Sequence, residues 1–146
     1  MRISEQWLRE WVSPKLESKA LANRLTLAGL EVASLESAGA DLKGVVVGQI
    51  DSLREHPHAD QLTLCSVDVG RRSRLEIVCG APNVVAGMKV PVALAGTELP
   101  NGVQVEKSEI RGVVSMGMLC SAPELGLAES AEGILPLGSD ASLGQP

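Results

Sequence analysis

The chain has 146 residues, 45% of them hydrophobic, which is enough for one ordinary domain with a small appendage. No apolar run approaches the about 18 residues of a membrane-spanning helix, and the charged first dozen positions argue against a secretory signal, so no membrane partner is expected. The net charge of -5 disfavours a general nucleic-acid binder. The deficit lies mainly at the C-terminal end, where four carboxylates meet no Lys or Arg: Glu124, Glu129, Glu132 and Asp140.

The cysteine and aromatic content narrows the classes further. Cys65, Cys79 and Cys120 are odd in number and follow no framework spacing, which indicates reduced thiols and a cytoplasmic protein. The chain has no Phe and no Tyr, and both tryptophans, Trp7 and Trp11, lie near its start. Because modules for single-stranded nucleic acid usually stack bases on exposed rings, base stacking is excluded for everything after Trp11.

Residues 1–38 predict two helices and a strand. Ser4 is an N-cap candidate for a short helix with apolar residues on one side: Trp7, Leu8, Trp11 and Val12. A second helix is expected over 17–28, burying Leu21, Leu25 and Ala28, and a strand over 30–35. So few elements cannot enclose a core. We therefore expect a partial α+β domain that packs on another part of the protein.

Residues 36–41 predict a linker, after which the hydrophobic period becomes strand-like. Turn residues separate five strand candidates, over 45–53, 62–69, 75–79, 89–94 and 103–110. Short strands with hairpin-like links and no long helix predict a mainly β domain over 41–146, built as a small closed barrel. Near the end, the capping-box spacing of Ser121 and Glu124 predicts a brief helix, and residues 133–137 predict a last strand.

The stretch HPHADQLTLC, residues 56–65, offers candidate metal ligands. A zinc site needs three or four ligands, but His56 and His58 stand alone and none of the three cysteines is expected to have a close partner. We therefore predict no metal site. Instead, Pro57 fixes a loop, Asp60 accepts hydrogen bonds from nearby backbone N–H groups, and His56 packs against the end of the barrel.

No pattern in the chain indicates catalysis. Cys79 and Cys120 lie at apolar strand ends, where thiols are usually small buried hydrophobes rather than nucleophiles. The sequence has no GxSxG motif, no phosphate-binding GxxxxGK[ST] loop and no paired acidic motif. We expect no catalytic residue and no cofactor site in this chain.

A phosphate-contacting face is the remaining candidate. Six cations lie on predicted turns and strand ends: Arg71, Arg72, Arg74, Lys89, Lys107 and Arg111. Without a ring to stack a base, they would bind the backbone of RNA rather than its bases. The same residues also fit an ordinary solvated surface, and both interpretations stay open.

Six segments in order resemble the N-terminal part of the bacterial phenylalanyl-tRNA synthetase beta subunit. They are SEQWLREWV (4–12), LTLAGLEV (25–32), VVVGQI (45–50), HPHADQL (56–62), VCGAPNV (78–84) and RGVVSMGMLCSAPELGL (111–127). From about Asp41 onward the chain is also similar to the wider family of tRNA-binding oligonucleotide-fold domains. The first 38 residues favour the beta subunit, because free-standing members of the wider family lack them.

The resemblance implies a five-stranded oligonucleotide-fold (OB-fold) barrel with a small N-terminal α/β segment. It implies a cytoplasmic enzyme of two alpha and two beta subunits, which joins phenylalanine to its tRNA with ATP and magnesium. In that family the active site lies on the alpha subunit, and a later part of the beta subunit completes the small N-terminal domain. His58 departs from the Asn or Asp usual in the family, which makes a family-wide ligand at this position unexpected.

Two classes of function follow. The chain is a tRNA-contacting accessory module of a synthetase, with partners in tRNA, the alpha subunit and the rest of the beta subunit. Alternatively, it is a structural or partner-binding barrel with negligible affinity for RNA in isolation. The arginines at 71, 72 and 74 favour the first class, and the missing aromatic residues favour the second.

Overall fold

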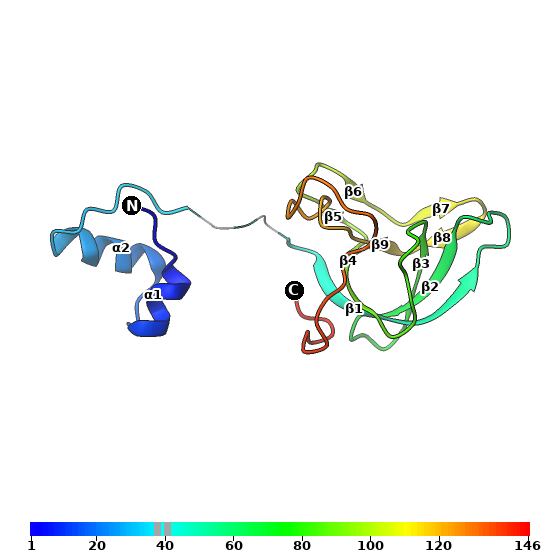
Figure 1. Ribbon diagram of the computed structural model, residues 1–146, viewed down its shortest axis with the longest axis horizontal. Helices are drawn as coiled ribbons and strands as arrows, with labels where there is room; N and C mark the ends of the chain where they lie inside the picture. Colours follow the sequence, from blue (N-terminus) through cyan, green and yellow to red (C-terminus); the bar gives the residue numbers. More distant parts are fainter. Residues whose placement is uncertain (37–38, 40–41) are drawn as a thin grey trace. The chain divides into compact units, whose positions relative to one another are not determined.

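The computed structural model describes residues 1–36, 39 and 42–146, so most of the predicted linker lies outside the described residues (Figure 1). Contacts within the chain separate two compact units, Met1–Ala38 and Gly39–Pro146. No helix in the described part of the chain is long and apolar enough to cross a membrane.

The N-terminal unit contains helices α1 (Glu5–Trp11) and α2 (Ser18–Leu27). The Ser4 hydroxyl oxygen accepts a hydrogen bond from the Trp7 N–H at 3.3 Å, which confirms the predicted cap. Little of the unit is buried: Leu21 is the one buried residue of α2, and α1 has none. The expected burial of Ala28 is therefore wrong, and Leu25 is only half-buried. Residues 30–35 form no strand, because they have no strand beside them to pair with.

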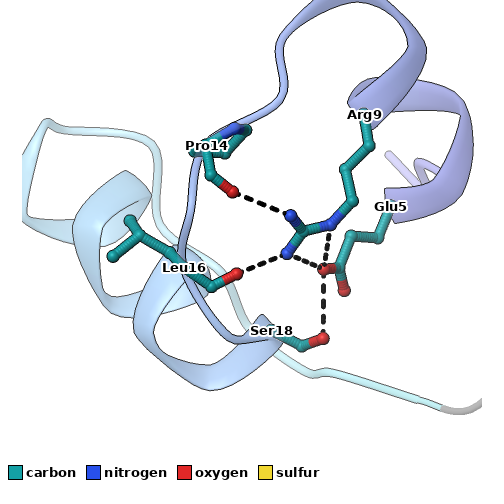
Figure 2. A network of polar contacts seen from close by, with 5 residues as sticks. All are labelled: Glu5, Arg9, Pro14, Leu16 and Ser18. Carbon is teal, nitrogen blue, oxygen red and sulfur yellow. Dashed lines mark hydrogen bonds and ion pairs between the residues drawn. The ribbon is translucent and has the colours of Figure 1, made fainter.

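The side chains of Arg9 and Glu5 connect α1 with the segment that leads into α2 (Figure 2). The guanidinium of Arg9 donates to Glu5 Oε1 (2.9 Å from Nε) and to the carbonyl oxygens of Pro14 (3.0 Å) and Leu16 (2.6 Å). Ser18, at the start of α2, donates its hydroxyl to the same Glu5 oxygen at 3.0 Å. These bonds satisfy backbone carbonyls between the helices and lower the pKa of Glu5, first through Arg9 and then through Ser18. Polar contacts thus provide stabilisation that the small hydrophobic core of this unit does not provide.

The second unit is a β-barrel, as predicted. Its main antiparallel sheet has the order β3-β2-β1-β4-β9, from β1 (Val45–Glu55), β2 (Thr63–Asp68), β3 (Leu75–Cys79), β4 (Lys89–Leu94) and β9 (Gly117–Leu119). The two edges approach each other where the Met116 N–H donates to Glu76 O at 2.8 Å. The Ser115 hydroxyl, almost fully buried, accepts from the Val78 N–H at 3.1 Å. These bonds close the sheet into the barrel drawn in Figure 1.

Two short hairpins connect β4 to β9. β5 (Thr97–Glu98) pairs with β6 (Gln104–Val105), and β7 (Ser108–Ile110) pairs with β8 (Val113–Ser115). The prediction of a single strand over 103–110 is therefore wrong. This segment contains two strands, β6 and β7, which pair in different sheets. Strands β8 and β9 were not predicted, because each has only three residues and a glycine precedes or begins it, at positions 112 and 117.

The C-terminal stretch crosses the barrel without regular structure, which corrects two predictions. Residues 121–126 form turns instead of a helix, although the Glu124 carboxylate accepts from the Ser121 N–H at 2.6 Å, as in one half of a capping box. Residues 133–137 are not a strand and form only isolated bonds, such as Leu135 N–H to Cys120 O at 3.1 Å.

Inward side chains of the strands form the core. Ile50, Val67, Ile77, Val90 and Val92 are completely buried in one cluster. A second cluster lies under the β5–β6 hairpin and includes Leu99, Val105 and Cys120. The polar side chains left on the outer surface and at the turns are those that can meet a ligand.

Candidate nucleic-acid interface

The turn between β2 and β3 presents two exposed arginines. The Asp68 carboxylate accepts a hydrogen bond from the Gly70 N–H at 2.8 Å, and Gly70 has φ of +72°, a conformation that favours glycine. Arg71 and Arg72 follow and are exposed. Within the described residues neither arginine forms an ion pair. Both guanidinium groups are therefore available to an anion.

Arg74, at the base of the same turn, is already engaged. Its Nε donates to the Asp51 carboxylate on β1, and its Nη1 lies 3.0 Å from Asp68 Oδ2 on β2. A second ion pair on the same outer surface joins Arg54 of β1 to Glu76 of β3. Carboxylates of the sheet therefore neutralise Arg54 and Arg74, whereas Arg71 and Arg72 in the turn have no such partner among the described residues.

Lys89 is also engaged, with the C-terminal stretch. Its Nζ donates to the carbonyl oxygens of Ser139 at 2.6 Å and Ala141 at 2.7 Å. Lys89 and Asp68 are both paired with Gln49 in the register of β1, so Lys89 lies at the same end of the sheet as the arginine turn. Its ammonium group thus holds the C-terminal stretch around residues 139–141 against the barrel instead of projecting into solvent.

Arg111 lies at the opposite end of β2 from the arginine turn. It occupies the tip of the β7–β8 hairpin with φ of 48°, and the preceding Ile110 O is 3.0 Å from the ring Nε2 of His56. Lys107 is exposed in the link just before β7. Since β2 has six residues, about 20 Å of strand separates its two ends. The six predicted cations therefore do not form one cluster.

The loop after β1 is structural. His56 is buried, with 5% of its surface exposed, and its Nδ1 accepts from the His58 N–H at 3.1 Å. This bond assigns the ring hydrogen to Nε2, which then donates to Ile110 O. His56 thus packs at the barrel end as predicted, but it also takes the role expected of Asp60, whose carboxylate forms no hydrogen bond among the described residues.

The cysteines are buried, as predicted, yet two of them are neighbours. Register pairs of Thr63 with Cys79 and of Cys65 with Ile77 make Cys65 and Cys79 diagonal neighbours across β2 and β3. The expectation that no cysteine has a close partner is therefore wrong, because pairing of distant segments was needed to bring them together. A hydrogen bond from the Cys65 thiol lowers the pKa of Cys79 to about 7. No group of three or more candidate metal ligands occurs in the described part of the chain.

The partners of Arg74 are what the sequence analysis missed. Asp51 and Asp68 precede it by 23 and by six positions, with no local spacing that indicates an ion pair. One signal was present: an Asp two residues before a Gly is typical of an Asx turn, which would have predicted the shape of the arginine turn.

A closed antiparallel barrel in which β1 pairs with both β2 and β4, with cations at its loop ends, is an oligonucleotide-fold barrel. The family model described as "Putative tRNA binding domain" matches residues 45–146, and the chain belongs to this tRNA-binding domain family. The C-terminal domain of p43 from Plasmodium vivax shares the fold at 20% identity and a TM-score of 0.50, over 68% of this chain and 56% of that one.

The whole length of the chain is similar to one group of curated proteins, in agreement with the resemblance found in the sequence. The phenylalanine–tRNA ligase beta subunit of Coxiella burnetii is 51% identical over 145 residues, and that of Hahella chejuensis is 49% identical over 144 residues. Each match covers 99% of this chain and 18% of the relative. The chain therefore spans about a fifth of the length of these relatives.

Proposed function

We propose that this chain is the tRNA-contacting accessory module of a phenylalanine–tRNA ligase beta subunit, and that it binds tRNA through backbone phosphates. The family match over the barrel and the beta-subunit relatives support this proposal. The observation that carries it is the turn after β2, where Arg71 and Arg72 are exposed and have no acidic partner among the residues that the structure describes. Guanidinium groups bind phosphate oxygens with two parallel hydrogen bonds, which suits such a turn to RNA.

The contact is expected to be weak and indifferent to base sequence. Arg74 and Lys89 are occupied within the barrel, and Lys107 and Arg111 lie away from the turn. No Phe, Tyr or Trp follows Trp11, so the barrel lacks the large rings on which such modules usually stack bases. Affinity then falls in the non-specific range of roughly 10⁻⁴ to 10⁻⁶ M, with strong dependence on salt.

For the longer protein we propose the ligation of phenylalanine to its tRNA, with ATP and magnesium, in the cytoplasm and together with an alpha subunit. The residues that the structure describes include no cluster of three candidate metal ligands, so we assign no magnesium site to them. We derive no step of the reaction from this chain. Its contribution is to hold tRNA or to join parts of the synthetase.

The N-terminal unit is proposed to pack against a later part of the same beta subunit. Trp7, Trp11 and Leu27 leave 57%, 77% and 86% of their surfaces exposed, and exposed apolar residues grouped in one small unit are typical of an interface. This proposal extends the expectation of a partial domain over residues 1–38.

A binding titration tests the proposed function. Wild-type chain and the double variant Arg71→Ala/Arg72→Ala are titrated with a labelled phenylalanine tRNA transcript at several salt concentrations. We expect the variant to lose about tenfold or more in affinity and to show a flatter salt dependence, because each phosphate contact releases counterions. A control, Arg2→Ala/Arg24→Ala, changes the net charge equally in the N-terminal unit and should leave most of the affinity. Equal losses in both double variants would refute a specific role of the turn.

The alternative of a structural barrel draws on the internal use of Arg74 and Lys89. It predicts no measurable binding by the wild type at low salt. A further comparison uses a transcript with another anticodon, which the proposal expects to bind equally well. Tight binding at high salt with a preference for the phenylalanine anticodon would contradict both functions.

A further inference from the structure

The outer surface of the barrel over β1, β2 and β3 has an unusual charge arrangement. Two arginines, Arg54 and Arg74, are matched there by three carboxylates, from Asp51, Asp68 and Glu76, so the ion pairs leave a net charge of minus one. Oligonucleotide folds commonly bind their ligands on the face of strands two and three. In this chain the ion pairs leave that face slightly negative, whereas the neighbouring turn carries the exposed Arg71 and Arg72.

The ion pairs of Arg74 are placed where exchange is easy. The side chain of Arg74 is 47% exposed, that of Asp51 is 36% exposed, and that of Asp68 is 18% exposed. Exposed ion pairs contribute little to folding, so replacing such a pair by a contact with another anion costs the barrel little. A phosphate would have to compete with the carboxylates of Asp51 and Asp68 for the guanidinium of Arg74. Both carboxylates belong to strands of the sheet itself.

We propose that Asp51 and Asp68 limit the affinity of this domain for RNA: their carboxylates hold Arg74 away from phosphate and restrict the contact to Arg71 and Arg72. The inference rests on the proposed contact of tRNA with the arginine turn. Asp68 has a second role, because the same carboxylate shapes the turn through the Gly70 N–H. Asp68 therefore shapes the turn that exposes Arg71 and Arg72, and it also neutralises Arg74.

Asparagine is the substitution that separates these roles. In Asp68→Asn the side-chain oxygen still accepts from the Gly70 N–H, so the turn keeps its shape while the negative charge is lost. Asp51→Asn is of similar shape and also removes one charge beside Arg74. Glu129→Gln removes a carboxylate from the exposed C-terminal stretch and is the matched control for net charge.

The test is a titration of the 146-residue chain with the same tRNA transcript at several salt concentrations. We expect Asp51→Asn and Asp68→Asn each to raise affinity about threefold to tenfold, the effect of freeing one guanidinium for one phosphate. The slope of log affinity against log salt should steepen by about one, and Glu129→Gln should change little. In the background of Arg74→Gln the gain from Asp51→Asn should vanish, because the two residues act as one unit.

The outcomes distinguish this inference from the proposed function. If the wild type binds and neither asparagine variant gains affinity, or if the gain persists without Arg74, the inference is wrong and the proposed function stands. If the wild type fails to bind but both asparagine variants bind, the two carboxylates do limit the affinity for RNA, but Arg71 and Arg72 alone do not hold tRNA and the proposed function is wrong. Absence of binding in all variants at low salt overturns both.

Discussion

The side-chain amide of Asn83 forms two hydrogen bonds with the backbone of Ile134. Its Nδ2 donates to Ile134 O at 2.8 Å, and its Oδ1 accepts from the Ile134 N–H at 2.9 Å. One side chain thus replaces a neighbouring strand and fixes the C-terminal stretch to the loop after β3. Ile134 is buried in the main core cluster, so this pairing also holds its side chain in the core of the barrel.

Asn83→Ala should release the C-terminal stretch. The variant leaves both backbone groups of Ile134 without their partners, and each unpaired buried group costs about 1–3 kcal/mol. We expect the variant to have a lower melting temperature than the wild type. Amide hydrogen exchange should become faster over residues 133–137, and more so than over β1. Asn101→Ala, in an exposed turn, is the control and should leave exchange at 133–137 unchanged. Unchanged exchange in Asn83→Ala would contradict the role given to this amide.

Ser115→Ala should destabilise the closure of the barrel. The Ser115 hydroxyl accepts from the Val78 N–H and donates to Gly117 O at 2.9 Å, and alanine removes both bonds from a buried position. We expect a loss of about 1–3 kcal/mol in the free energy of unfolding, measured by urea denaturation. Ser52→Ala, on the exposed face of β1, should change this free energy by less than about 0.5 kcal/mol.

Arg9→Ala should loosen the N-terminal unit without affecting the barrel. Both tryptophans of the chain belong to α1, so tryptophan fluorescence reports this unit alone. We expect the fluorescence transition in urea to move to lower concentration, because the Leu16 carbonyl loses its donor and the Pro14 carbonyl keeps only the Leu16 N–H. The barrel transition, followed by circular dichroism, should stay in place. Arg24→Ala is the control for loss of an exposed arginine.

The thiol pair predicts how stability depends on pH above neutrality. The pKa of Cys79 is lowered from 9.0 to about 7, so the folded state holds fewer protons than the unfolded state between these values, and stability rises with pH. Burial raises the pKa of Cys120 to about 11, and the pKa of Cys65 is also raised, so stability falls again above pH 9. Melting temperatures from pH 6 to 10 should show this maximum. Cys79→Ser should abolish the rise between pH 7 and 9, and a rise that persists would refute the assignment.

The sequence alone determined the features that depend on neighbours along the chain. The bounds of β3 and β4 agree with those predicted, because turn residues flank each run of alternating or apolar residues. The Ser4 cap was likewise predictable, since it involves the next helical turn only. Membership of the tRNA-binding domain family could also be inferred from short motifs, and the match of the family model over residues 45–146 confirms it.

Only the tertiary structure decided which side chains share a surface. Six cations in one chain look alike in sequence, but strand register places Arg74 between two carboxylates and Lys89 beneath a strap of backbone carbonyls. Register likewise brings Cys65 beside Cys79. Residues 103–110 divide into β6 and β7 because each part pairs with a different strand. In each case the partner lies far along the chain or across a strand, where local propensity and spacing carry no information and the packing of the barrel decides.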